Sequence, residues 1–200
     1  MLIEQELLRF CAEKTREIAA EYDKACVIPG KDDGFPRSAD DLHLIMHGRH
    51  GLPIFHKEIR IPWRQSKVRS FYIPYPDRIE IWYASGMPSP YLRYYKTKEL
   101  LQIHLWREDH ATTDVVELVH NMRLREAPSS IDLDLGHKAT SDTLGEIAAM
   151  EFLFPFARRL ACIESALGTD GVEALAKQYG VPPFVVQTCL NNIEGLRGFF

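Results

Sequence analysis

The pattern of apolar and polar positions predicts helices at both ends of the chain and strands between them. Residues 2–25 repeat apolar side chains every three or four positions, with charges on the opposite face, as an amphipathic helix does. A loop rich in proline, glycine and aspartate follows at 29–36. Ser38 is then a suitable N-cap for a short helix that ends near Gly48 or Gly51.

Between residues 52 and 83 the pattern becomes that of strands. After a short lead-in, two runs rich in β-branched and aromatic residues occupy 68–73 and 79–83, separated by turn residues at 75–78. These two runs are predicted to form an antiparallel hairpin. The prolines of this region suit strand ends and sheet edges, where a missing N–H costs least: Pro53, Pro62 and Pro74.

Helical periodicity returns in the rest of the chain. Helices are predicted over 94–106 (entered at Ser89 and Pro90), 113–125, 142–153 and 156–167, with a pair of helices over 171–190. Pro155 ends one of them because it removes a backbone donor and clashes with the preceding turn. The predicted fold is α+β, a small antiparallel or mixed sheet packed on helices with a C-terminal helical pair. The chain is divided into an N-terminal helix at 1–27, an α+β domain at 28–160 and a helical segment at 161–200.

Polar side chains interrupt the apolar stripes of two of these helices. Lys98 and Gln102 lie on or beside the stripe of the 94–106 helix, and Glu146 lies on the apolar face of the 142–153 helix. A buried polar group needs a partner. We therefore expect the polar side chains of these two helices to pair with each other.

Two motifs in these helices resemble the ImmA/IrrE family of zinc metallopeptidase-like proteins. That family carries H-E-x-x-H on one helix and a later acidic residue on a helix that ends close to F-A-x-x-L-L-M-P. Here Lys98-Glu99-Leu100-Leu101-Gln102 stands in place of the first motif, and residues 148–155, AAMEFLFP, match the second. The short helix, the small sheet and the motif helix also follow one another in the family's order. Both ligand histidines are absent.

The resemblance implies a zincin-like fold with a degenerate metal site. In the family, two imidazoles and a third ligand hold zinc, and the glutamate deprotonates the bound water. By this correspondence Glu99 is a vestigial general-base position, Lys98 and Gln102 are vestigial ligand positions, and Glu146 or Asp142 takes the third. A protonated lysine cannot ligate a metal, so no metal and no cofactor are predicted. Instead, Lys98 is expected to pair with Glu146 or Asp142 and so tie the two helices together.

Composition narrows the function classes. The net charge of the 200-residue chain is −4, with 46% hydrophobic and 26% charged residues, as in globular domains that bind neither nucleic acid nor membrane by bulk charge. No apolar run approaches the ~20 residues of a membrane span. The start of the chain lacks the pattern of a secretory signal. Its four cysteines are far apart, which predicts reduced thiols in a cytoplasmic protein.

Histidines provide the other candidate metal ligands. His43 and His47 have the i, i+4 spacing of two ligands, with His50 nearby, but a solvated histidine face is the preferred interpretation because no acidic partner lies at ligand spacing. His56 lies on a predicted strand with no obvious companion. Glu117 and His120 are interpreted as an ordinary surface pair at i, i+3.

Two further segments suggest binding. Basic and aromatic residues alternate between Arg60 and Tyr72, a pattern that fits single-stranded nucleic acid or a phosphorylated partner but more commonly protects a sheet edge. The basic members are Arg60, Arg64, Lys67 and Arg69, and the aromatic ones are Trp63, Phe71 and Tyr72. Residues 171–190 have helix-turn-helix spacing around Gly180, but the second helix offers no Arg or Lys to DNA, so packing is preferred.

Three functions are consistent with these residues. The favoured one is a pseudoenzyme that binds a protein partner, in a regulatory role of phage-derived or stress-response type. The second is a working metallohydrolase with zinc held by non-standard ligands, such as His104, His110, His120 or His137 with Glu146. The third is a small DNA-binding regulator that uses the C-terminal helix pair.

Overall fold

A computed structural model describes residues 2–27, 34–66, 68–105, 140–162 and 169–200. Helix α1 (Leu2–Cys26) and helix α2 (Ala39–His50) come first. The Ser38 side chain accepts hydrogen bonds from the amides of Asp40 and Asp41, and Gly51 ends α2 with a φ of 66°. Both caps predicted for this helix are confirmed, with Gly51 and not Gly48 at its end.

The sheet has three strands in the order β1-β3-β2 and is mixed. Strand β1 (Ile54–Pro62) runs parallel to β3 (Ile79–Ser85), and β2 (Ser70–Pro74) pairs with β3 in the antiparallel sense. The predicted hairpin is therefore confirmed, whereas β1 is longer than its predicted lead-in. Proline ends both outer strands and is absent from the central one, because a central strand must donate on both sides.

Helix α3 (Ser89–His104) follows the sheet, with Pro90 in its first turn. Helix α5 (Thr140–Leu153) packs across α3, and Pro155 separates α5 from α6 (Phe156–Cys162) as predicted. The C-terminal pair is α7 (Thr169–Tyr179) and α8 (Pro183–Asn191), and a short helix α9 (Ile193–Leu196) follows. The predicted helix at 113–125 and the end of the one at 156–167 lie outside the described residues.

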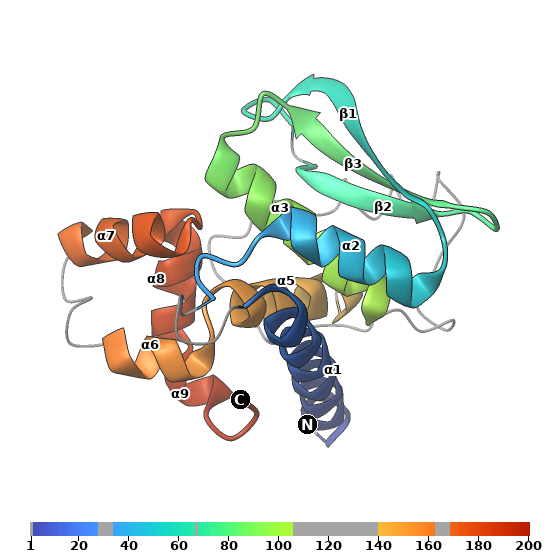
Figure 1. Cartoon of the computed structure of the whole chain (residues 1–200). Helices are drawn as coiled ribbons and strands as arrows, with labels where there is room; N and C mark the ends of the chain where they lie inside the picture. The colour runs from blue at the N-terminus through green and yellow to red at the C-terminus, as the bar shows by residue number, and fades with distance from the viewer. Residues whose placement is uncertain (1, 28–33, 67, 106–139, 163–168) are drawn as a thin grey trace.

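Helix α3 is the centre of the arrangement. It contacts α2, α5, β2 and β3. Figure 1 shows the sheet on one side of α3 and the helices α6 to α9 on the other, with α1 and α5 beneath. The coarse prediction of an α+β fold, with a small mixed sheet packed on helices, is confirmed.

One continuous apolar core joins these layers. It includes Ile18 of α1, Met46 of α2, Ile81 of β3, Leu101 of α3 and Phe152 of α5, all fully buried. None of the helices in the described ranges combines the length and apolar character that a bilayer span requires. Polar side chains buried in this packed interior must each be matched by a hydrogen-bond or ion-pair partner.

Candidate functional site

Lys98 lies buried between α3 and α5. Only 5% of its side chain is exposed. Its Nζ is 2.9 Å from Glu99 Oε1 and forms a second ion pair with Asp142 Oδ1 at the start of α5. The ammonium therefore bridges two carboxylates from two helices. Lysine is almost never buried unless it is paired in this way.

Glu99 points from α3 toward the sheet and is 1% exposed. Ser70 Oγ, at the start of β2, donates a hydrogen bond of 2.6 Å to the same Oε1 atom that faces Lys98. Burial, and then the negative charge of Glu99, raise the pKa of the hydroxyls of Tyr72 and Tyr83. The carboxylate is thus held by a hydroxyl and an ammonium in a desolvated environment.

Gln102 lies one turn further along α3, against α5. It is 8% exposed, and a Cβ added to Gly145 would lie 3.2 Å from both its Cβ and its Oε1. Glycine at this position therefore lets the two helices approach closely around the glutamine. Glu146, the next residue, is half-buried, and its charge contributes after burial to the raised pKa of Tyr94. Among the positions that the sequence singled out, Lys98 pairs with Asp142, and Gln102 lies against Gly145, the residue before Glu146.

The predicted pairing of Lys98 with an acid of the second helix is confirmed, and the acid is Asp142. Glu151 has a separate role. Its carboxylate accepts from the amide of Phe156 at 3.0 Å and pairs with buried Arg159 at 2.9 Å, so it caps α6 just beyond Pro155. Burial is the main cause of the raised pKa of Glu151, and the charge of Arg159 opposes it.

The residues at the positions that the resemblance assigns to metal ligands do not fit a zinc ion. A lysine ammonium has no lone pair to donate, and an amide oxygen binds zinc poorly compared with imidazole or thiolate. Within the described ranges, no group of three or more histidine, cysteine, aspartate or glutamate side chains has the geometry to hold a metal. The positive charge at this crossing comes from Lys98.

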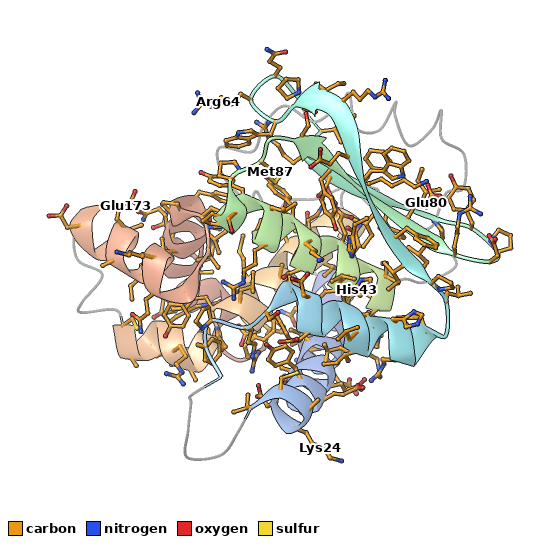
Figure 2. The ribbon with its side chains drawn as sticks, turned by 45° about the horizontal axis from the view of Figure 1, so that its top comes forward. Lys24, His43, Arg64, Glu80, Met87 and Glu173 are labelled. Carbon is orange, nitrogen blue, oxygen red and sulfur yellow. The ribbon has the colours of Figure 1, made fainter. Side chains whose placement is uncertain are left out.

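The histidines of α2 lie on a partly exposed face, and His43 has a partner on the sheet. His56 of β1 contacts His43 of α2 through Nε2 and Nδ1 at 2.8 Å, and Tyr83 OH through its own Nδ1 at 2.6 Å. His43 lies on α2 beside the sheet (Figure 2). The expectation that His56 has no companion was wrong, because the fold brings β1 beside α2 and β3, which no local pattern predicts. His47 is exposed and His43 is half-buried, so this face of α2 is partly open to solvent, as expected.

His104 is placed away from Lys98, toward α1 and α2. Its Nε2 is 4.0 Å from Glu17 Oε2, and its ring packs edge-on against that of His50 with centroids 6.0 Å apart. Burial is the main cause that lowers the pKa of His104 to about 4. The other histidines of the metallohydrolase alternative, His110, His120 and His137, lie outside the described residues, as does Glu117.

The basic and aromatic run divides between two faces. Tyr72 faces Glu99 in the interior, while Phe71 stacks on Trp82 of β3 with ring centroids 6.3 Å apart. The Arg69 guanidinium lies 5.1 Å from the ring centre of Trp63. Tyr72 and Phe71 do not share a face, since successive side chains of a strand point to opposite faces, and Tyr72 packs partly buried against the core. Lys67 lies outside the described residues.

The C-terminal pair is docked on α3. Arg93 of α3 donates to the carbonyls of Tyr179 and Gly180 at 2.5 and 2.8 Å, at the turn between α7 and α8. Phe184, in the first turn of α8, packs against Tyr91 and Tyr94 of α3 with ring centroids 5.9 and 5.4 Å apart. The N-terminal end of α8, which a helix-turn-helix would present to base edges, therefore packs against α3.

Comparison with known proteins adds little to this geometry. No family profile and no curated protein matches the chain. Among solved structures, a "Mycobacterium tuberculosis transcriptional regulator" is similar over 92% of this chain and 50% of that protein, with 14% identity and a TM-score of 0.45. The chain thus spans half the length of that regulator. A likeness at this level leaves the function to be argued from the residues.

Proposed function

We propose that this protein is a pseudo-metallopeptidase of ImmA/IrrE type, in which a lysine takes the place of the metal and which acts by binding another protein. One observation carries the proposal: the Lys98 ammonium lies between the carboxylates of Glu99 and Asp142. In a working zincin the same place is occupied by a dication between ligands of two helices. Here α3 and α5 are joined by a salt bridge instead.

The electrostatics of the crossing support this interpretation. Two carboxylates in a desolvated site repel each other, and each is costly to bury without a cation. A single ammonium supplies less charge than zinc, and the hydrogen bond from Ser70 provides further stabilisation for Glu99. Glu99, which the resemblance places at the general-base position of the family, is therefore engaged with the protein groups Ser70 and Lys98.

The proposed biological role and cellular location come from the resemblance to the family. A regulatory role of phage-derived or stress-response type, exerted through a protein partner in the cytoplasm, is the expectation for a family member without catalysis. The compartment is also the one expected from the wide spacing of the four cysteines in the sequence, and Cys11 and Cys189 are buried thiols.

The test is to rebuild the site. The double variant Lys98→His/Gln102→His would place two imidazoles at i, i+4 around Glu99, opposite Asp142 and Glu146. If the crossing is descended from a zinc site, this variant binds one zinc per chain, measured by mass-spectrometric metal counting and calorimetry after purification from zinc-containing medium. The unmodified protein is expected to bind none, and Lys98→His alone to bind far more weakly, since one ligand is missing.

Two matched variants complete the experiment. Adding Asp142→Asn or Glu146→Gln to the double variant identifies the third ligand by the larger loss of affinity. A folded double variant that takes up no zinc would remove the zincin-like interpretation. Stoichiometric zinc in the unmodified protein, lost on chelation together with a peptidase activity, would show a working metallohydrolase instead.

A further inference from the structure

A row of aromatic rings crosses the surface from the end of the sheet to the C-terminal helices. Arg69 lies over Trp63, Trp63 contacts Tyr91 with centroids 4.8 Å apart, and Tyr91 contacts Phe184 at 5.9 Å. The rings come from the turn after β1, the first turn of α3 and the first turn of α8. We call Trp63, Tyr91 and Phe184 the aromatic row.

The row is open to solvent. Phe184 is 39% exposed, Trp63 and Tyr91 are half-buried, and Leu92, which follows Tyr91 in α3, is 38% exposed. Single exposed apolar residues are ordinary, but a contiguous group of them is typical of an interaction site. Tryptophan, tyrosine and arginine are also the residues that contribute most to binding at protein interfaces.

Positive charge gathers at one end of the row. Arg60 and Arg64 are exposed and form no ion pair within the described ranges, and Arg69 donates to the carbonyl of Ser66 at 2.5 Å. Arg64 lies at the same end of the sheet as Met87, which precedes α3 (Figure 2). The backbone amide of Trp63 donates to Ser85 O at 2.9 Å, which holds this turn against the end of β3.

Acidic residues are absent from the three sequence segments that supply the row. None occurs in 59–76, 81–98 or 178–193, although the whole chain has a net charge of −4. The surface is therefore a basic and aromatic patch on an acidic protein. An acidic partner would be attracted to this patch and repelled by the acidic faces of the same protein.

We propose that the aromatic row and its basic end bind an acidic segment of a protein partner, with an apolar side chain seated against Trp63, Tyr91 and Phe184 and carboxylates on Arg60 and Arg64. This inference rests on the proposed protein-binding function and names the chemistry of the partner. It concerns a surface that is separate from the Lys98 crossing.

The distribution of charge favours a peptide over nucleic acid. A single-stranded nucleic acid carries a phosphate at every step and needs cations along its whole path. Among the described residues of the three segments that supply the row, the exposed cations Arg60 and Arg64 lie in the segment of Trp63. The segment of Phe184, residues 178–193, has no charged residue. An amphipathic acidic segment, charged at one end and apolar at the other, matches the two ends of the aromatic row.

The experiment uses the full chain and a phage-displayed library of random dodecapeptides. Selected peptides are expected to combine several Asp or Glu residues with an aromatic or large aliphatic residue. The dissociation constant of the best peptide, measured by fluorescence anisotropy, should rise about tenfold or more in Arg60→Glu/Arg64→Glu and in Phe184→Ala. The double charge reversal lies on exposed side chains, so it tests the surface even where Phe184→Ala perturbs packing.

Two variants serve as controls. Arg9→Glu reverses an exposed charge on α1, and Leu44→Ala removes an apolar side chain that is 66% exposed on α2, so both should leave binding unchanged. Enrichment of basic peptides, binding that ignores the Arg60/Arg64 reversal, no enrichment, or equal binding of a thymidine oligonucleotide would overturn the proposal. Because the zinc rebuilding experiment does not involve this surface, failure of one leaves the result of the other intact.

Discussion

Burial of Lys98 makes the stability of this protein depend on a single ammonium group. Its two partners are a fully buried carboxylate, Glu99, and one that keeps some contact with water, Asp142, whose side chain is 28% exposed. An ion pair of this kind is costly to break because the remaining charges lose their compensation without regaining water. The partial exposure of Asp142 moderates the cost.

Lys98→Met is therefore expected to lower the free energy of unfolding by about 3 kcal/mol, near the lower end of the range for breaking a buried pair. Urea denaturation followed by circular dichroism measures it. Lys96→Met on the same helix is the control, since Lys96 pairs with Asp40, which is 85% exposed, and such surface pairs contribute about 1 kcal/mol or less. Equal losses in the two variants would contradict a structural role for the Lys98 bridge.

The His104 imidazole predicts a loss of stability toward acid. Its pKa is lowered from 6.5 to about 4 in the folded protein, chiefly by burial, and its side chain is 9% exposed. Between these two pH values the unfolded state binds the proton that the folded state excludes. Stability is therefore complete above pH 6.5 and falls as the pH drops toward 4, by about 3 kcal/mol in total.

His104→Gln removes this titration and is expected to flatten the pH dependence of the unfolding free energy in that window. His50 also has a lowered pKa, caused mainly by burial, so part of the slope remains. Glu17 beside His104 loses stabilisation at lower pH, because its hydrogen bond with Lys14 lowers its own pKa. An unchanged slope above pH 4.5 in the variant would show that His104 is not the buried titrating group.

At the scale of elements, the ends of helices set the geometry of the molecule. Helix α7 ends in a Schellman motif, in which Val181 N donates to Ala176 O at 3.0 Å and Gly180 N to Lys177 O at 3.3 Å. Gly180 has a φ of +59°, which glycine adopts freely. The Arg93 guanidinium fits against this turn and also donates to the carbonyl of Arg37, so it connects the turn to the start of α2.

Gly180→Ala should be costly for two reasons, the left-handed backbone and the space that Arg93 occupies. A Cβ at residue 180 would come within 2.3 Å of Arg93 Nη1. We expect a loss of about 1–3 kcal/mol in thermal or urea unfolding. Gly51→Ala has a similar φ of +66° with nothing within 4 Å, so it measures the backbone contribution alone and should cost less. If both variants lose the same stability, Arg93 does not constrain the turn.

For the molecule as a whole, α3 joins the sheet, the α5 crossing and the C-terminal helices. This shared position is the reason why we expect α8 not to serve as a recognition helix. Phe184 at its N-terminal end packs on Tyr91 and Tyr94, and the described part of the chain around it, residues 178–193, has no charged residue. DNA binding depends on cations that neutralise phosphates.

We expect no tight binding of duplex DNA, and we expect Gln187→Ala/Thr188→Ala to leave any regulatory phenotype unchanged. Fluorescence anisotropy with genomic duplex fragments over a range of salt concentrations is the measurement. High affinity for a defined duplex with a steep salt dependence, abolished by these two changes, would establish a DNA-binding regulator instead.

Local sequence determined most of the elements. Caps, glycine and proline act on their immediate neighbours, so Ser38, Gly51, Pro155 and Gly180 mark boundaries that the structure confirms. The lysine on an apolar stripe likewise predicted a buried charge at residue 98, because the periodicity of a helix assigns each side chain to a face.

Only the tertiary structure decided which groups meet. The choice of Asp142 as the partner of Lys98 depends on the angle and spacing of α3 and α5, which Gly145 and Gln102 set together. The parallel pairing of β1 with β3 brought His56 to His43, and the pleat of β2 turned Tyr72 inward toward Glu99. The physical reason is the same in each case. A local pattern specifies the face on which a side chain lies, whereas its partner is selected by contacts between residues far apart in the chain.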